Sequence, residues 1–293
     1  MARPLGALMR PLSELEPARL ARVRGVLTDI DDTITTDGRI TAQAYSAIER
    51  LHDAGYLVIP VTGRPAGWCD HIARMWPVDA VVGENGAFYT HYDREQRKLT
   101  TRHVDEGGNG ENGRAGRDAG ERSAAGAASR RDRLHAIGER ILREVPGSAW
   151  ASDQAYRYAD IAIDFCEDVP RLAAVDIGRI VDIMSEEGLT AKVSSIHVNG
   201  WFGAYDKLGM TRTLLAEAFA IDLDGRRGDF MFVGDSPNDA PMFEFFPLSV
   251  GVQNVADFVL PPEQQPKFIT SQRSGSGFTE VARRLTGQAR ARP

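Results

Sequence analysis

The sequence predicts an α/β fold, a doubly wound parallel sheet into which a separate α+β module is inserted. Up to about residue 90, short apolar runs alternate with segments of helical spacing, which is typical of β-α-β units. Over residues 91–202 the pattern changes to helices and strands of alternating polarity. From residue 203 the alternation of short apolar runs with helical segments returns. One domain, residues 20–90 and 203–286, is therefore expected to be split by a second one.

The predicted elements of the first part are short and regularly spaced. Three apolar runs fit buried parallel strands: residues 25–30, 56–61 and 80–82. Two segments between them have apolar residues at helical spacing: residues 41–54 and 66–75. Gly55 follows the first of these helices, as expected at a helix C-terminus, and Pro77 stops the second. This order predicts a parallel sheet with helices on its faces.

The inserted module and the second half of the split domain have their own elements. In the module, helices are predicted over 131–144 and 172–187, and strands over 158–165 and 190–198. The dipeptide Asn199-Gly200 is typical of a hairpin turn. After Lys207, helices are predicted over 208–220, 239–245 and 277–285, and strands over 230–233 and 248–250.

Glycine is concentrated in one segment, residues 105–129, which has no aromatic and no large aliphatic residue. Such a segment buries too little apolar surface to offset the entropy lost on ordering, so we expect a disordered loop within the module. Residues 1–19 and 287–293 are predicted to be terminal tails.

Composition excludes several classes of protein. The chain has 293 residues, with 35 Lys and Arg against 41 Asp and Glu, so it lacks the basic excess typical of nucleic-acid or membrane-surface binding. No apolar run reaches the roughly 18–20 residues that span a bilayer, and the N-terminus lacks the apolar centre of a signal peptide. Its two cysteines, Cys69 and Cys166, cannot form a disulfide scaffold. We expect a cytoplasmic protein that binds neither nucleic acid nor membrane; its oligomeric state stays open.

Polar clusters follow three of the predicted strands. They are Asp29-Ile30-Asp31-Asp32-Thr33, Thr62-Gly63-Arg64-Pro65 and Gly234-Asp235-Ser236-Pro237-Asn238-Asp239. Each alone also fits a turn or a helix cap. Because the carboxyl ends of parallel strands meet at one edge of a sheet, we expect the clusters to converge there. Gathered carboxylates require a hard cation, and oxygen ligands suit Mg²⁺ better than zinc. Lys207 could add a positive charge, although alone it reads as a surface lysine.

These motifs carry a resemblance to a known family. In order, Asp29-x-Asp31-x-Thr33, Thr62-Gly63-Arg64, Lys207 and Gly234-Asp235-Ser236-x-Asn238-Asp239 resemble the four motifs of the haloacid dehalogenase (HAD) superfamily. The chain is most similar to its sugar-phosphatase branch with a type IIB cap, which includes sucrose-phosphate and trehalose-phosphate phosphatases. The module's place between Thr62 and Lys207 and the turn Glu84-Asn85-Gly86-Ala87 fit that branch. The resemblance spans about residues 25–286 and implies a Rossmann-like core with an inserted cap. Asp32, where relatives commonly have glycine, departs from the pattern.

The resemblance implies a Mg²⁺-dependent phosphatase. Asp29 would be the nucleophile that forms an aspartyl-phosphate, and Asp31 the general acid and base. The phosphate site would be formed by Thr62, Gly63, Arg64 and Lys207. Mg²⁺ would be bound by Asp29, the Asp31 backbone carbonyl and Asp235, with Asn238 and Asp239 orienting these ligands.

The cap would supply specificity for a phosphorylated sugar. His197 and Asn199 are the candidate sugar-binding residues, with Asp160, Asp164 and Trp201 as further candidates. Taken alone, Trp201 is more often a core residue and His197 an ordinary strand residue. A phosphomutase, or a phosphatase of another small metabolite such as phosphoglycolate, is the alternative function. A non-enzymatic phospho-receiver is disfavoured, because Gly83-Glu84-Asn85 and not an aspartate follows the third strand.

Overall fold

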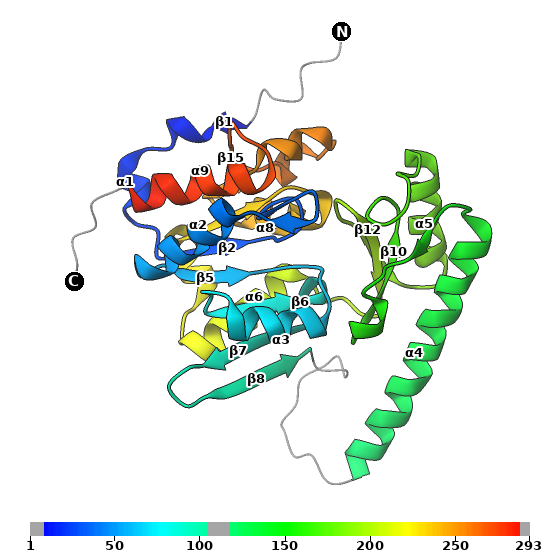
Figure 1. Cartoon of the computed structure of the whole chain (residues 1–293). Helices are drawn as coiled ribbons and strands as arrows, with labels where there is room; N and C mark the ends of the chain where they lie inside the picture. Colours follow the sequence, from blue (N-terminus) through cyan, green and yellow to red (C-terminus); the bar gives the residue numbers. More distant parts are fainter. Residues whose placement is uncertain (1–8, 105–117, 288–293) are drawn as a thin grey trace. The chain divides into compact units, whose positions relative to one another are not determined.

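The structure, a computed structural model, describes residues 9–104 and 118–287, which form two compact units (Figure 1). The larger unit combines the chain up to Arg102 with the chain from Tyr205 onward, and the smaller unit is His103–Ala204.

The larger unit is built on a parallel sheet of six strands in the order β1-β15-β14-β13-β2-β5. Their bounds are Arg10–Pro11 (β1), Phe268–Ile269 (β15), Ser249–Gly251 (β14), Phe230–Gly234 (β13), Gly25–Thr28 (β2) and Leu57–Pro60 (β5). The central strands β2 and β13 are buried along their whole length, as expected for near-continuous apolar runs covered on both faces. The register pairs Thr28 with Val233 on one side and with Pro60 on the other, so these strands end level with one another.

Beyond β5 the sheet continues into a hairpin. The parallel bridge Val61–Val82 links β5 to β6 (Ala80–Gly83), and β6 pairs with the antiparallel strand β7 (Phe88–Asp93). Strand β8 (Lys98–His103) completes this three-stranded sheet. The sequence assigned residues 91–102 to the inserted module. They instead group with the larger unit, because β7 forms a ladder with β6 that pairs Ala80 with His91.

Helices from both halves of the chain cover this sheet. They are α1 (Pro17–Leu20), α2 (Ala42–Asp53), α3 (Ala66–Met75), α6 (Lys207–Phe219), α7 (Leu223–Arg226), α8 (Ala240–Phe245) and α9 (Ser274–Thr286). Helix α2 begins where the Thr41 hydroxyl accepts a hydrogen bond from the Ala44 N–H, and it buries the apolar stripe that its spacing predicts. It packs against α9 from the other end of the sequence (Figure 1), which joins the two halves of the split domain.

The smaller unit is an antiparallel sheet with two helices. Its strand order is β11-β12-β10-β9, with bounds Thr190–Val193, His197–Trp201, Asp160–Asp164 and Ala149–Trp150. Ile161, Ile163 and Val198 form one core cluster with apolar residues of α4 (Asp118–Glu144) and α5 (Ala174–Glu186). Because side chains alternate along a strand, Asp160, Asp164, His197 and Asn199 share the opposite face.

The fold class is confirmed, and several local predictions are corrected. Asn199-Gly200 is not a turn: both residues lie inside β12, paired with Ala162 and Ile161, and the hairpin turns at residues 194–196. The glycine serves close packing here, since a Cβ at Gly200 would lie 2.6 Å from the Met184 sulfur. A short hairpin of β3 (Thr35–Thr36) and β4 (Arg39–Ile40) was not predicted.

Two segments assigned to tails or loops are structured. Residues 9–19 are not a tail, because β1 pairs with β15 and the buried side chains of Leu12 and Leu15 anchor the segment. Helix α4 begins at Asp118, within the predicted loop 105–129; alanine, abundant there, has the highest helix propensity. The predictions for residues 1–8, 105–117 and 288–293 lie outside the described residues. Within the described ranges, no helix combines the length and the apolar character needed to cross a membrane.

Candidate active site

The carboxyl ends of three adjacent strands bring the predicted motifs together. Asp29 follows β2 directly, Thr62 lies just beyond β5, and Asp235 follows β13. Since β2 lies between the other two strands, these residues share one edge of the sheet. The Asp29 N–H donates to the Val233 carbonyl at 2.9 Å, which ties the first motif to the last. All three side chains are buried.

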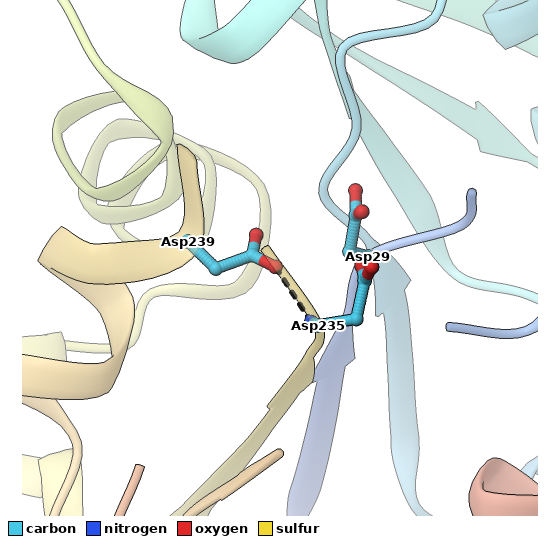
Figure 2. Close-up of side chains that lie close together, drawn as sticks. All are labelled: Asp29, Asp235 and Asp239. Atoms are coloured by element: carbon cyan, nitrogen blue, oxygen red, sulfur yellow. Dashed lines mark hydrogen bonds between the residues drawn. The ribbon is translucent and has the colours of Figure 1, made fainter. Parts of the chain in front are cut away.

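A cluster of three carboxylates occupies this edge (Figure 2). One oxygen each of Asp29, Asp235 and Asp239 lies within 4.8 Å of the others. Asp239 also shapes the loop that carries Asp235: its Oδ2 accepts the N–H groups of Asp235 at 3.0 Å and of Ser236 at 3.3 Å. This reciprocal cap at the turn before α8 explains why Asp239 is needed four residues after Asp235.

Lys207 is the cation of the cluster and not a surface lysine. Its Nζ donates to Asp29 Oδ1 at 2.9 Å and to Asp239 Oδ1 at 2.7 Å, and its side chain is 1% exposed. It is the first residue of α6, whose preceding residue Asp206 accepts the Gly209 N–H and so defines where the helix begins. The helix start therefore determines where the ammonium lies.

The cluster holds more negative than positive charge. Three carboxylates and one ammonium leave a formal charge of −2 in a buried site. Burial raises the pKa of Asp29 to about 7; Lys207 opposes this shift, while Asp239 and Asp31 add to it. The pKa of Asp235 also lies well above its ordinary value, through burial and then repulsion from Asp29 and Asp239. Burial disfavours the Lys207 ammonium, but Asp239 and Asp29 outweigh it and raise the pKa of Lys207.

This donor set fits a hard divalent cation. A charge of +2 would balance the cluster, and carboxylate oxygens are the ligands that Mg²⁺ prefers. Among the described residues, the donors to the Asp235 side chain are neutral: the Thr33 hydroxyl donates to its Oδ1 at 2.9 Å and Asn254 Nδ2 to its Oδ2 at 3.1 Å. Asp235 is therefore oriented without its charge being neutralised.

The Thr62-Gly63-Arg64 loop follows the neighbouring strand. Thr62 Oγ1 accepts the Arg64 N–H at 3.0 Å, so the hydroxyl hydrogen can be donated to a ligand. The Arg64 guanidinium binds Asp31: its Nε donates to both carboxylate oxygens at 2.9 and 3.0 Å, and Nη2 lies 2.7 Å from Oδ1. The sequence predicted Arg64 as a phosphate-binding residue; its part-buried pairing with Asp31 is a contact that the sequence did not predict.

Further residues at this edge were missed by sequence reasoning. Asn254, just beyond β14, donates to Asp235 and to the Asp32 carbonyl, and Asn85, just beyond β6, accepts from Asn238 Nδ2 at 3.2 Å. The sequence signal that could have identified Asn85 and Asn254 is their position shortly after predicted strands. Asp32 has φ 51°, in the left-handed region that glycine adopts most easily and aspartate tolerates.

The candidate cap residues all belong to the smaller unit. Asn199 Nδ2 donates to Asp160 Oδ2 at 2.9 Å, and His197 Nε2 lies 2.9 Å from Glu167 Oε2. Asp164 accepts three backbone N–H groups of residues 166–168 and so shapes the turn after β10. Trp201 is buried, and its pairing with Asp160 places it on the same face of the sheet as His197 and Asn199.

Comparison with known proteins agrees with the motifs. A family model described as haloacid dehalogenase-like hydrolase matches residues 26–106, which contain Asp29, Asp31 and Thr62. A phosphoglycolate phosphatase of Methanospirillum hungatei is 26% identical over 268 residues, covering 89% of this chain and 96% of the relative. The chain is a hydrolase similar to the haloacid dehalogenase family. The family match thus covers the first motifs, and the match to this relative extends over nearly the whole length of both chains.

Solved structures share the fold of this hydrolase. The C-terminal domain of C. albicans trehalose-6-phosphate phosphatase superposes with a TM-score of 0.64 at 11% identity, over 96% of this chain and 99% of that one. A sugar phosphatase of HAD subclass IIB superposes with a TM-score of 0.56 at 12% identity, over 91% and 100% of the two chains. The hydrolase therefore has the core fold with an inserted cap that its sequence predicts.

Proposed function

We propose that this hydrolase is a Mg²⁺-dependent phosphatase of a small sugar phosphate, acting through an aspartyl-phosphate on Asp29. The class, phosphoric monoester hydrolase, follows from the family match and from the full-length phosphatase relative. The observation that carries the proposal is the buried cluster of Asp29, Asp235 and Asp239 around Lys207. A cluster with excess negative charge can accept a dianionic phosphate only together with a cation.

The residues that would hold Mg²⁺ are Asp29, the Asp31 backbone carbonyl and Asp235, with Asn238 and Asp239 orienting them. When bound, the ion would neutralise the negative charge of the approaching phosphoryl group. Lys207 would contribute the second positive charge, and it holds Asp29 Oδ1 in a fixed direction. Thr62 would donate its hydroxyl hydrogen to a phosphoryl oxygen.

The reaction has two displacements at phosphorus. In the first, an Asp29 oxygen attacks, the bond from phosphorus to the sugar oxygen breaks, and Asp31 gives its proton to the leaving alcohol. In the second, Asp31 takes a proton from water while the water oxygen attacks, and the bond from phosphorus to Asp29 breaks. The products are the free sugar and inorganic phosphate. Arg64 would hold the Asp31 carboxylate between these steps.

A small sugar phosphate is the favoured substrate. The polar face of the smaller unit's sheet carries His197 and Asn199, side chains suited to sugar hydroxyls. The relative named phosphoglycolate phosphatase favours phosphoglycolate as a second candidate, since it matches nearly the whole chain. A phosphomutase would need a bisphosphate activator and would release little free phosphate.

Phosphate release tests the proposal. The Mg²⁺-loaded protein is incubated with a panel of sugar phosphates, phosphoglycolate and nucleotides, beside Asp29→Asn and the surface control Asp224→Asn. We expect the wild type and the control to release phosphate and Asp29→Asn to lose at least about a thousandfold in rate, because the amide is a poor nucleophile. A rate of phosphate release by Asp29→Asn equal to that of the wild type would overturn the proposal. A preference for phosphoglycolate would make phosphoglycolate the substrate in place of a sugar phosphate.

A further inference from the structure

Asn85 has a buried side-chain NH₂ group that the contacts described above do not use. The residue is 2% exposed, and among the described residues its Nδ2 has no hydrogen-bond partner. A buried N–H₂ group without a partner is unfavourable by about 1–3 kcal/mol, so in a native protein it needs an explanation. A ligand that supplies the missing acceptor is one explanation.

The surroundings of Asn85 place this amide between two loops of the candidate active site. Its backbone N–H donates to the Thr62 carbonyl at 3.0 Å, and its Oδ1 accepts from Asn238 Nδ2. Its Nδ2 is close to Gly63, where an added Cβ would lie 3.2 Å from it. The amide therefore lies beside the Thr62-Gly63-Arg64 loop and is braced by the loop that carries Asp235.

The orientation of the amide follows from its partner. Asn238 Oδ1 is engaged by the Ser236 hydroxyl at 2.9 Å, so Asn238 presents its NH₂ group toward Asn85. Asn85 must then present its oxygen to Asn238, and its own NH₂ group faces the other way. Hydrogen bonds that link the side chains of Ser236, Asn238 and Asn85 thus orient the Asn85 NH₂ group.

The backbone of Asn85 is also held in an uncommon conformation. Its φ of 53° and ψ of 26° lie in the left-handed region, and the strain is sustained by the bond to Thr62. Asparagine tolerates this region better than most residues, as do aspartate and glycine. Strained backbone combined with an unused donor is typical of a binding position rather than of a core position.

We infer that Asn85 is a substrate-binding residue whose Nδ2 donates a hydrogen bond to a phosphoryl oxygen beside Thr62. This inference rests on the proposed function, because it takes the Thr62 loop as the phosphate site. A neutral donor adds affinity for an anion without adding a positive charge that would compete with Lys207 for Asp29. No covalent step is assigned to Asn85.

Binding of inorganic phosphate tests this role without turnover. Isothermal titration of the Mg²⁺-loaded protein compares the wild type with Asn85→Gly and Asn85→Asp, both of which tolerate the left-handed backbone. Arg97→Gly, at an exposed position with φ 53°, controls for the entropy of a new glycine. We expect Asn85→Gly to weaken phosphate binding roughly 10- to 100-fold and Asn85→Asp to weaken it further by repulsion.

Mg²⁺ affinity separates binding from a merely structural role. We expect both Asn85 variants to hold Mg²⁺ within about threefold of the wild type, with the phosphate affinity of Arg97→Gly unchanged. Phosphate affinity of Asn85→Gly equal to the wild type, equal losses of Mg²⁺ and phosphate affinity, or no phosphate binding by the wild type would each overturn the inference. Phosphate binding without any phosphate release by the wild type would instead refute the proposed function and leave the role of Asn85 standing.

Discussion

Buried charge is treated differently in the two units of this hydrolase. In the smaller unit, Arg157 lies between two buried aspartates: its Nη2 is 2.9 Å from Asp153 and its Nη1 is 3.0 Å from Asp160. In the larger unit, within the part of the chain that the structure describes, Asp29 and Asp239 share the Lys207 ammonium and Asp235 accepts from neutral donors. In the first arrangement the guanidinium contacts both carboxylates and a formal charge of −1 remains, whereas the second has a formal charge of −2 and is suited to a ligand.

The comparison shows how a structural acidic cluster differs from a binding one. Both sets of aspartates are buried, so burial alone does not separate them. What separates them is the charge and direction of their donors. The planar guanidinium of Arg157 reaches two carboxylates at once. In the larger unit, Lys207 leaves oxygens of three aspartates facing one another. Substitutions in the two clusters should therefore have opposite effects on stability.

The largest effect is expected for Asp235→Asn. Removing this charge should abolish Mg²⁺ binding and lower Mg²⁺-dependent phosphate release at least about a thousandfold, because the amide is a far weaker ligand. The metal-free variant should melt at or above the temperature of the metal-free wild type, since repulsion among buried carboxylates is relieved. Calorimetric titration with Mg²⁺ and thermal unfolding in EDTA measure the two effects. A lower melting temperature in EDTA would show that the cluster is structural.

Arg157→Met should have the opposite effect in the smaller unit. It leaves Asp153 and Asp160 buried without their counter-ion, which should lower the free energy of unfolding by about 3–5 kcal/mol. Urea unfolding measures the loss. Arg212→Met, which breaks an exposed pair with Asp224, is the matched control and should change stability by less than about 1 kcal/mol.

A second set of variants isolates the charge. Adding Asp153→Asn and Asp160→Asn to Arg157→Met removes the stranded carboxylates and should restore most of the lost stability. If Arg157→Met alone unfolds like the wild type, the saturated cluster does not stabilise the smaller unit, and the contrast between the two units fails.

The sequence predicted the strand-end carboxylates but not how their contacts are completed. Asp29 and Asp235 could be found because an apolar run and the residue after it are local features. The pairing of Arg64 with Asp31 depends on side-chain directions across two strands, which no spacing encodes. Asn85 and Asn254 were missed because asparagine after a strand is common in ordinary turns.

The inserted module was harder to predict because its signals are weaker. The apolar alternation at 158–165 located β10 (Asp160–Asp164), since that face packs on a helical core. The dipeptide Asn199-Gly200 misled the prediction, because pairing with β10 outweighs its local turn preference. Tertiary pairing of this kind depends on residues almost 40 positions away and is invisible to a short window.

The smallest effect is expected for Asp164→Asn, in the smaller unit. The carboxylate accepts N–H groups of Cys166 and Glu167 on Oδ1 and of Asp168 on Oδ2, so it is a turn residue by its contacts. An asparagine keeps one acceptor oxygen and places an NH₂ group opposite an N–H group, which should lower the free energy of unfolding by about 1–2 kcal/mol. Since every oxygen of Asp164 already has a donor from this turn, KM for the favoured phosphate ester should stay within about twofold of the wild type. Urea unfolding and steady-state kinetics on the same preparation measure both quantities. A tenfold rise in KM with unchanged stability would make Asp164 a substrate ligand. A carboxylate whose oxygens all accept hydrogen bonds from the protein could then still be a binding residue, and this criterion would not separate structural from binding carboxylates.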